Sequence, residues 1–264
     1  MRLLLASALV LLALAAPVHA DEFNAGTETT AAGALSATLS WQAGDFGPQN
    51  ARLTVTRAGG IAFDQTIPKA CGNECSRIVG DTDDFQFVNL DGIGEPELYI
   101  NSFNLDRCCE TMGVYALDTA TGGYTEFTMD WRSPLSVQDV DHDGISEIVT
   151  RDGRLGRALL GGTLPRHVLR YANRGVTDVT RDFPGLIRTD ARETLATVRH
   201  LHRRDLEAPA ALGTYLADQY LLGKGAAALK LIDRQLARGV VGNAKQSRTY
   251  RRKLLALLQR YGYR

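Results

Sequence analysis

The sequence lacks every common catalytic signature. It contains no Gly-x-Ser-x-Gly nucleophile elbow, no Walker phosphate loop, no dinucleotide-binding glycine fingerprint and no His-Glu-x-x-His pair. These absences argue against the enzyme classes that such motifs mark without excluding catalysis. The paired carboxylates of a glycosidase have no fixed spacing in a sequence, so a hydrolase of that kind is still compatible with this one. A non-catalytic role is favoured.

Net charge and long hydrophobic runs are also missing. The 264 residues carry 30 basic and 30 acidic side chains, and 44% of them are hydrophobic. This composition excludes a disordered chain and suffices for a sizeable core. A membrane span needs about 20 apolar residues, and the longest such run, residues 3–16, is shorter. We therefore expect no transmembrane segment.

That short run is typical of an export signal. Arg2 precedes it, and Pro17–Ala20 places small residues where a signal peptidase cleaves. We expect residues 1–20 to be a signal peptide and the mature chain to begin at Asp21. The protein is then expected in the periplasm or outside the cell.

Cysteine is scarce, and its even number in an exported chain indicates disulfides. The cysteines form two clusters, Cys71 with Cys75 and Cys108 with Cys109. Disulfides between the two clusters would close loops of roughly 35 residues and stabilise the fold by a few kcal/mol. Pairing within the clusters would require a strained vicinal bridge, and a four-thiolate zinc site fits adjacent ligands and an oxidising compartment poorly. We therefore favour disulfides between Cys71 or Cys75 and Cys108 or Cys109.

The charges are unevenly distributed along the chain. Residues 21–165 carry 22 acidic and 9 basic side chains, whereas residues 166–264 carry 8 acidic and 20 basic ones. Arg234–Arg264 contains no acidic residue. This asymmetry indicates two halves that dock on each other, a polyanion-binding tail, or simply solvated helix faces. Nucleic acid is not an expected partner.

Two kinds of hydrophobic pattern divide the mature chain. Short β-rich runs between Gly-rich and Asp-rich turns predict an antiparallel meander over residues 21–182. Helical spacing then predicts a basic all-α bundle over residues 183–264. The expected strands are Leu35–Trp41, Arg52–Thr56, Ile61–Thr66, Glu97–Asn101, Met112–Asp118, Tyr124–Met129, Glu147–Arg151 and Arg166–Tyr171. The expected helices are one capped by Thr189 or Asp190 that starts near Ala191, then Ala210–Leu222, Ala226–Ala237 and Ser247–Tyr261.

An acidic loop at Asp139–Glu147 is the most specific chemical feature. Carboxylates at alternate positions of a tight loop can converge on one hard cation, and Gly144 permits the sharp turn. The loop is not an EF-hand, because its twelfth position is Thr150 rather than Glu. The calcium ligands that this spacing predicts are Asp139, Asp141 and Asp143, the carbonyl of Ile145, and Glu147.

A weaker copy of the loop lies fifty residues earlier. Its fifth position is Ile93, which has no side-chain oxygen. The copy predicts either a weak metal site or a turn held by its own hydrogen bonds, and it indicates an internal repeat of propeller-blade length. Its candidate ligands are Asn89, Asp91, Glu95 and Glu97.

Phe87–Tyr99 and Val137–Thr150 resemble the FG-GAP/VCBS repeats of integrin-like β-propellers. In that family an acidic loop between two strands of a blade binds calcium. The wider stretch is similar to exported bacterial VCBS-repeat proteins, in which a Cys-Cys pair follows the first loop. The resemblance implies calcium-stabilised structure and binding at surfaces. Two motifs cannot close a ring of blades, so a partial propeller-like fold is expected.

Three functions follow from these features. The favoured one is an exported, non-catalytic, calcium-stabilised module that binds a protein or a glycan. The second is a secreted hydrolase with a carboxylate and calcium cleft. The third is a polyanion binder that uses the basic residues of Arg234–Arg264.

Overall fold

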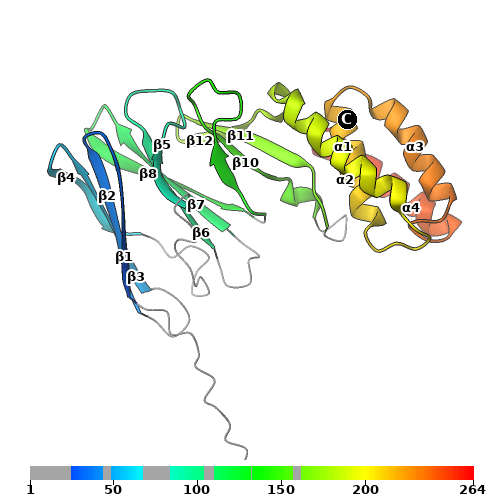
Figure 1. Cartoon of the computed structure of the whole chain (residues 1–264), viewed down its shortest axis with the longest axis horizontal. Coiled ribbons are helices and arrows are strands. Elements are labelled where there is room, and N and C mark those ends of the chain that lie inside the picture. Colours follow the sequence, from blue (N-terminus) through cyan, green and yellow to red (C-terminus); the bar gives the residue numbers. More distant parts are fainter. Residues whose placement is uncertain (1–24, 44–48, 68–83, 104–109, 132, 157–161) are drawn as a thin grey trace, which may run out of the picture.

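The computed structural model describes residues 25–43, 49–67, 84–103, 110–131, 133–156 and 162–264. These residues form a mixed fold in which three four-stranded antiparallel sheets precede four helices. Figure 1 shows the sheets following one another along the long axis of the molecule, with the helices at one end. The described residues form no closed barrel or propeller.

Each sheet is a meander in which consecutive strands are neighbours. The eight predicted strands are confirmed, and four others were not predicted because they are short or poor in large apolar residues. The first sheet contains β1 (Gly26–Ala32), β2 (Leu35–Gln42), β3 (Gln49–Arg57) and β4 (Gly60–Thr66). The second contains β5 (Phe85–Val88), β6 (Glu97–Phe103), β7 (Glu110–Asp118) and β8 (Gly123–Trp131). The third contains β9 (Ser136–Gln138), β10 (Glu147–Arg151), β11 (Arg166–Ala172) and β12 (Gly175–Asp178).

The sheets pack face to face because their inner strands are apolar on both sides. In β6, Leu98 and Ile100 join the core shared with the first sheet, while Tyr99 between them joins the core shared with the third. In β10, Ile148 faces the second sheet and Val149 packs in a cluster with Phe183 ahead of the helices. Successive side chains of a strand point to opposite faces, so each middle strand serves two cores.

The helices are α1 (Pro184–His200), α2 (Ala208–Leu221), α3 (Gly225–Ala237) and α4 (Ala244–Arg260). The start predicted for the first helix, near Ala191, is wrong. Pro184 begins α1, because its fixed backbone angle suits the first helical position and its missing N–H is not needed there. Asp190 therefore lies inside the helix and is buried.

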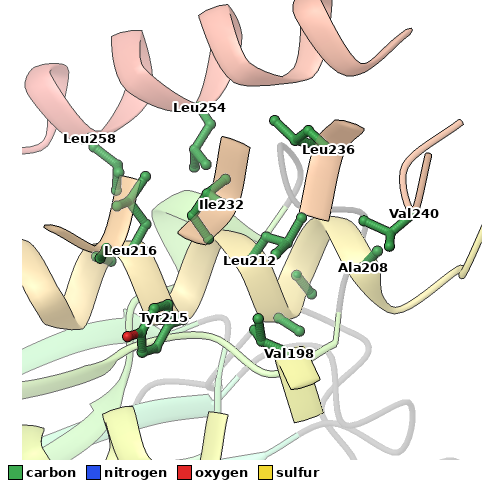
Figure 2. Close-up of a cluster of buried hydrophobic side chains, with 14 of the residues drawn as sticks. Val198, Ala208, Leu212, Tyr215, Leu216, Ile232, Leu236, Val240, Leu254 and Leu258 are labelled. Carbon is green, nitrogen blue, oxygen red and sulfur yellow. The ribbon is translucent and has the colours of Figure 1, made fainter. Parts of the chain in front are cut away.

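The helices enclose a core of their own, separate from the sheet cores. Leu212 and Leu216 of α2, Ile232 of α3, and Leu254 and Leu258 of α4 are fully buried and face one another (Figure 2). The two leucines of α2 are four residues apart, as are the two of α4, and this spacing places both members of a pair on one helix face. In α2, α3 and α4 the apolar residues at helical spacing are thus the ones that pack. Among the helices in the described part of the chain, none is both long and apolar enough to span a bilayer.

Polar contacts fasten the helices to the third sheet. An ion pair of 2.6 Å joins Arg151 of β10 to Asp190 of α1. The hydroxyl of Tyr263, after α4, donates to buried Asp152 at 2.8 Å. These contacts hold the end of the sheet and the end of the chain together.

Candidate metal centre

The loop between β9 and β10 folds around its own carboxylates. Asp139 accepts the main-chain N–H groups of Asp143 and Gly144 at 3.1 and 3.0 Å. Asp143 accepts the N–H of Ile145 at 2.8 Å. Gly144 has a φ of 87°, which a side chain would disfavour, so glycine is needed at this turn. The alternating Asp spacing therefore shapes the loop before any ion is considered.

Glu147 closes the loop from the first residue of β10. Its side chain is fully buried, and it accepts the N–H of Val140 at 3.1 Å. A buried carboxylate is unfavourable unless hydrogen bonds and opposite charge compensate it. The strand position thus fixes one acidic ligand rigidly, while Asp141 and Asp143 are exposed.

The carboxylate oxygens converge as a single cation would require. One oxygen each from Asp139, Asp141 and Glu147 lie within 4.8 Å of one another. Two ligands of one calcium ion, each at about 2.3–2.6 Å, are at most about 5.2 Å apart. An all-oxygen donor set suits a hard divalent cation, the class to which the predicted calcium belongs. Asp143 lies in the same loop but is not one of these three side chains, and the carbonyl of Ile145 stays a predicted ligand.

Arg170 of β11 supplies an unpredicted positive charge to the loop. Its guanidinium forms an ion pair with Glu147 and lies 3.8 Å from Asp141 and 3.6 Å from Asp143. Hydrogen bonding to Glu147 raises the pKa of Arg170, so the group stays charged. Arg170 therefore compensates one negative charge of the loop, that of Glu147, without metal. Sequence spacing could not reveal this pairing, which depends on the register between β10 and β11.

The earlier loop, between β5 and β6, repeats this arrangement. Glu97 is buried and accepts the N–H of Leu90 at 2.7 Å, as Glu147 does from Val140. Asn89 accepts the N–H of Gly92 at 2.9 Å, and Asp91 that of Ile93 at 2.7 Å. Both loops are thus closed by a buried Glu seven residues after the amide that it accepts.

Among the described residues, no basic side chain forms an ion pair with Glu97 of the earlier loop. Leu98 pairs with Tyr115, so Ala116 takes the place that Arg170 has in the next sheet. Burial raises the pKa of Glu97 to about 7, although the hydrogen bond from Leu90 opposes the shift. Glu95 turns to the first sheet, where Arg57 donates to it at 2.9 and 3.0 Å.

The two loops touch. The side-chain amide of Asn89 donates to the carbonyl of Gly144 at 2.7 Å, and the N–H of Ser146 donates to the carbonyl of Asn89 at 2.7 Å. A Cβ on Gly92 would lie 2.7 Å from Ile145, so glycine permits the approach. In Figure 1 both loops lie at the same edge of neighbouring sheets. The earlier loop therefore braces the later one.

Sequence reasoning missed a cleft between the third sheet and α4. It has a volume of about 770 Å³ and is lined by residues that include Trp131, Arg154, His167, Asp178 and Tyr261. His167 lies 3.0 Å from Asp178. No sequence signal could have found this cleft, because its residues come from strands, a 3₁₀ turn and a helix that meet only in the folded chain.

Two acidic groups of this cleft, Asp152 and Asp178, are poor proton donors near neutral pH. Burial opposes ionisation of Asp178, yet hydrogen bonds from His167 and Thr180 outweigh it and lower the pKa. Burial of Asp152 is likewise outweighed by Arg154 and Tyr263, which lower its pKa. A glycosidase needs one carboxyl with a raised pKa. Neither Asp152 nor Asp178 meets this need.

Two predictions concern residues that the structure does not describe. The signal peptide, residues 1–20, lies outside the described residues. So do Cys71, Cys75, Cys108 and Cys109, and the disulfides stay a prediction.

Comparisons of the chain with known proteins identify no relative. No family model matches the chain, and neither the curated proteins nor the solved structures contain a significant match.

Proposed function

We propose that the protein is an exported, non-catalytic binding module that calcium stabilises, and that it binds a protein or a glycan in the periplasm or outside the cell. The convergence of Asp139, Asp141 and Glu147 carries this proposal, because one oxygen from each lies within 4.8 Å of the others, close enough to share one cation. Calcium bound there would link the two loop aspartates to Glu147 at the start of β10. The missing catalytic motifs favour binding over catalysis.

The arrangement of the sheets supports a blade-like, FG-GAP/VCBS type of repeat. The second and third sheets are both four-stranded antiparallel meanders. Each carries an acidic loop between its first two strands, and each loop is closed by a buried Glu. The shared position and the shared hydrogen bond are what an internal repeat of about fifty residues would produce.

Calcium is expected to raise the thermal unfolding midpoint of the purified protein by several degrees over its value in excess EGTA. A ligand present at 100 times its dissociation constant contributes about 2.7 kcal/mol, which is enough for such a shift in a chain of this size. Differential scanning calorimetry measures the effect. Asp141→Ala should abolish the rise, whereas Asp182→Ala, which changes an exposed carboxylate outside the loops, should keep it.

An unchanged midpoint in calcium, with no calcium found by elemental analysis, would sink the proposal. An unchanged midpoint with one calcium per chain would show an ion that EGTA does not remove. The same rise in Asp141→Ala as in the unmodified protein would place the ion elsewhere.

Arg170→Gln is expected to tighten calcium binding by about tenfold or more. Arg170 lies against the same carboxylates that the ion needs, so calcium must displace its charge. Isothermal titration calorimetry gives the two dissociation constants. Arg174→Gln is the matched control, because Arg174 pairs with Asp118 at 2.8 Å and not with a carboxylate of the later loop. Equal or weaker binding by Arg170→Gln would mean that Arg170 does not compete with the ion.

A further inference from the structure

A basic pocket lies where α3 ends and α4 begins. Its volume is about 660 Å³, and four guanidinium groups line it: those of Arg203, Arg238, Arg248 and Arg251. One acidic residue, Asp233, also contributes to the lining. Most of its lining lies in the basic stretch Arg234–Arg264 that the sequence singled out, and the pocket is remote from the candidate metal centre along the chain.

The one acidic residue does not neutralise the pocket. Asp233 is paired with Arg251, which donates to both of its oxygens at 2.6 and 3.2 Å. Arg238 donates to the neutral amide oxygen of Gln235 at 2.9 Å. Within the described part of the chain, no carboxylate pairs with Arg203, Arg238 or Arg248. Three uncompensated positive charges therefore surround one concavity.

Three segments of the chain bring these charges together. The turn after α3 is tied to the α1–α2 connection, because the N–H groups of Arg204 and Asp205 donate to the carbonyls of Gly239 and Val240 at 3.1 and 2.9 Å. Arg203 consequently lies beside the turn, with its Nε 3.5 Å from where a Cβ on Gly239 would be.

The start of α4 is fixed as well. Asn243 and Gln246 form a reciprocal capping box, with hydrogen bonds of 2.8 and 3.0 Å. Asn243 lines the pocket, so the positive end of the α4 dipole adds to the field of the arginines. The capping box also orders the first turn that leads to Arg248.

We propose that this pocket binds a tetrahedral oxyanion, a phosphate or sulfate group carried by an anionic ligand. Guanidinium groups present planar pairs of donors that match such oxygens. A tetrahedral oxyanion offers oxygens to donors arriving from several directions, whereas a single carboxylate is satisfied by one guanidinium. Like charges held around a concavity repel one another until an anion enters. The site does not depend on calcium.

The test is a calorimetric titration of the full-length protein with inorganic pyrophosphate and, separately, with a heparin-derived hexasaccharide. The variant Arg238→Gln/Arg248→Gln removes two charges of the pocket. Arg188→Gln/Arg192→Gln removes the same charge from exposed positions of α1 and is the matched control. Thermal unfolding of both variants verifies that they are folded, which is expected because all four side chains are exposed.

We expect the pocket variant to bind at least tenfold more weakly and the control to stay within about twofold. Tighter binding of the hexasaccharide than of pyrophosphate would identify the group as part of a sulfated polysaccharide. The reverse order would identify a small phosphorylated ligand. Failure of both probes to bind, or equal losses in the two variants, would overturn the proposal.

Discussion

Asp218→Asn is expected to stabilise the protein at pH 8 by a few kcal/mol and to flatten the dependence of its stability on pH. Asp218 lies in α2 and is 1% exposed. Burial, followed by the charge of Asp190, raises its pKa to about 9. Arg151 and Arg166 oppose the shift but do not cancel it. Asp218 is therefore protonated in the folded protein at neutral pH.

The sign of the effect follows from proton binding. Between about pH 4 and pH 9 the folded state holds a proton on Asp218 that the unfolded chain has lost. Stability therefore falls as the pH rises through this window, by about 1.4 kcal/mol per pH unit for one full proton. An amide stays neutral across this range without binding a proton, so Asp218→Asn would avoid the penalty.

Urea unfolding at pH 5, 7 and 8.5 measures this effect. Asp190→Asn is the contrasting variant, since Asp190 is the partner of Arg151 at 2.6 Å and of Arg166 at 3.4 Å. Its loss leaves two half-buried guanidinium groups without their counter-charge, so Asp190→Asn should destabilise at every pH. Lower stability of Asp218→Asn than of the unmodified protein at pH 8 would show that Asp218 is ionised in the fold.

Glu147→Gln is expected to abolish the calcium-dependent rise in the unfolding midpoint and to weaken metal binding by about two orders of magnitude or more, because ligand charge sets calcium affinity. In EGTA the variant should also lose about 2 kcal/mol of stability, since Glu147 is buried and pairs with Arg170. Calorimetric titration and urea unfolding measure the two effects.

Glu97→Gln is the matched control in the earlier loop. Glu97 occupies the equivalent buried position, and an amide oxygen can still accept the N–H of Leu90. No described cation compensates Glu97 in the way that Arg170 compensates Glu147, so we expect a smaller loss of stability than for Glu147→Gln, or a gain. Calcium binding should persist. If Glu97→Gln removed it instead, the earlier loop would be the one that holds the ion.

Local patterns in the sequence determined the secondary structure well. The strands that alternate or carry large apolar residues, such as β2 and β7, were predicted, because one face or both faces of each strand are buried. The stripes of α2 to α4 were predicted for the same reason. Short strands such as β9 and β12 were missed, since their pairing with longer neighbours holds them in place rather than their own composition.

The sequence by itself also determined the frame of the acidic loop, because Asp139 and Asp143 bond to amides only two to five residues away. Only the tertiary structure decided what surrounds that frame. Arg170 reaches Glu147 through strand register, Asn89 reaches Gly144 across two sheets, and Asp218 meets Asp190 across two helices. Such contacts depend on how separate elements pack, and spacing along one chain carries no record of that packing.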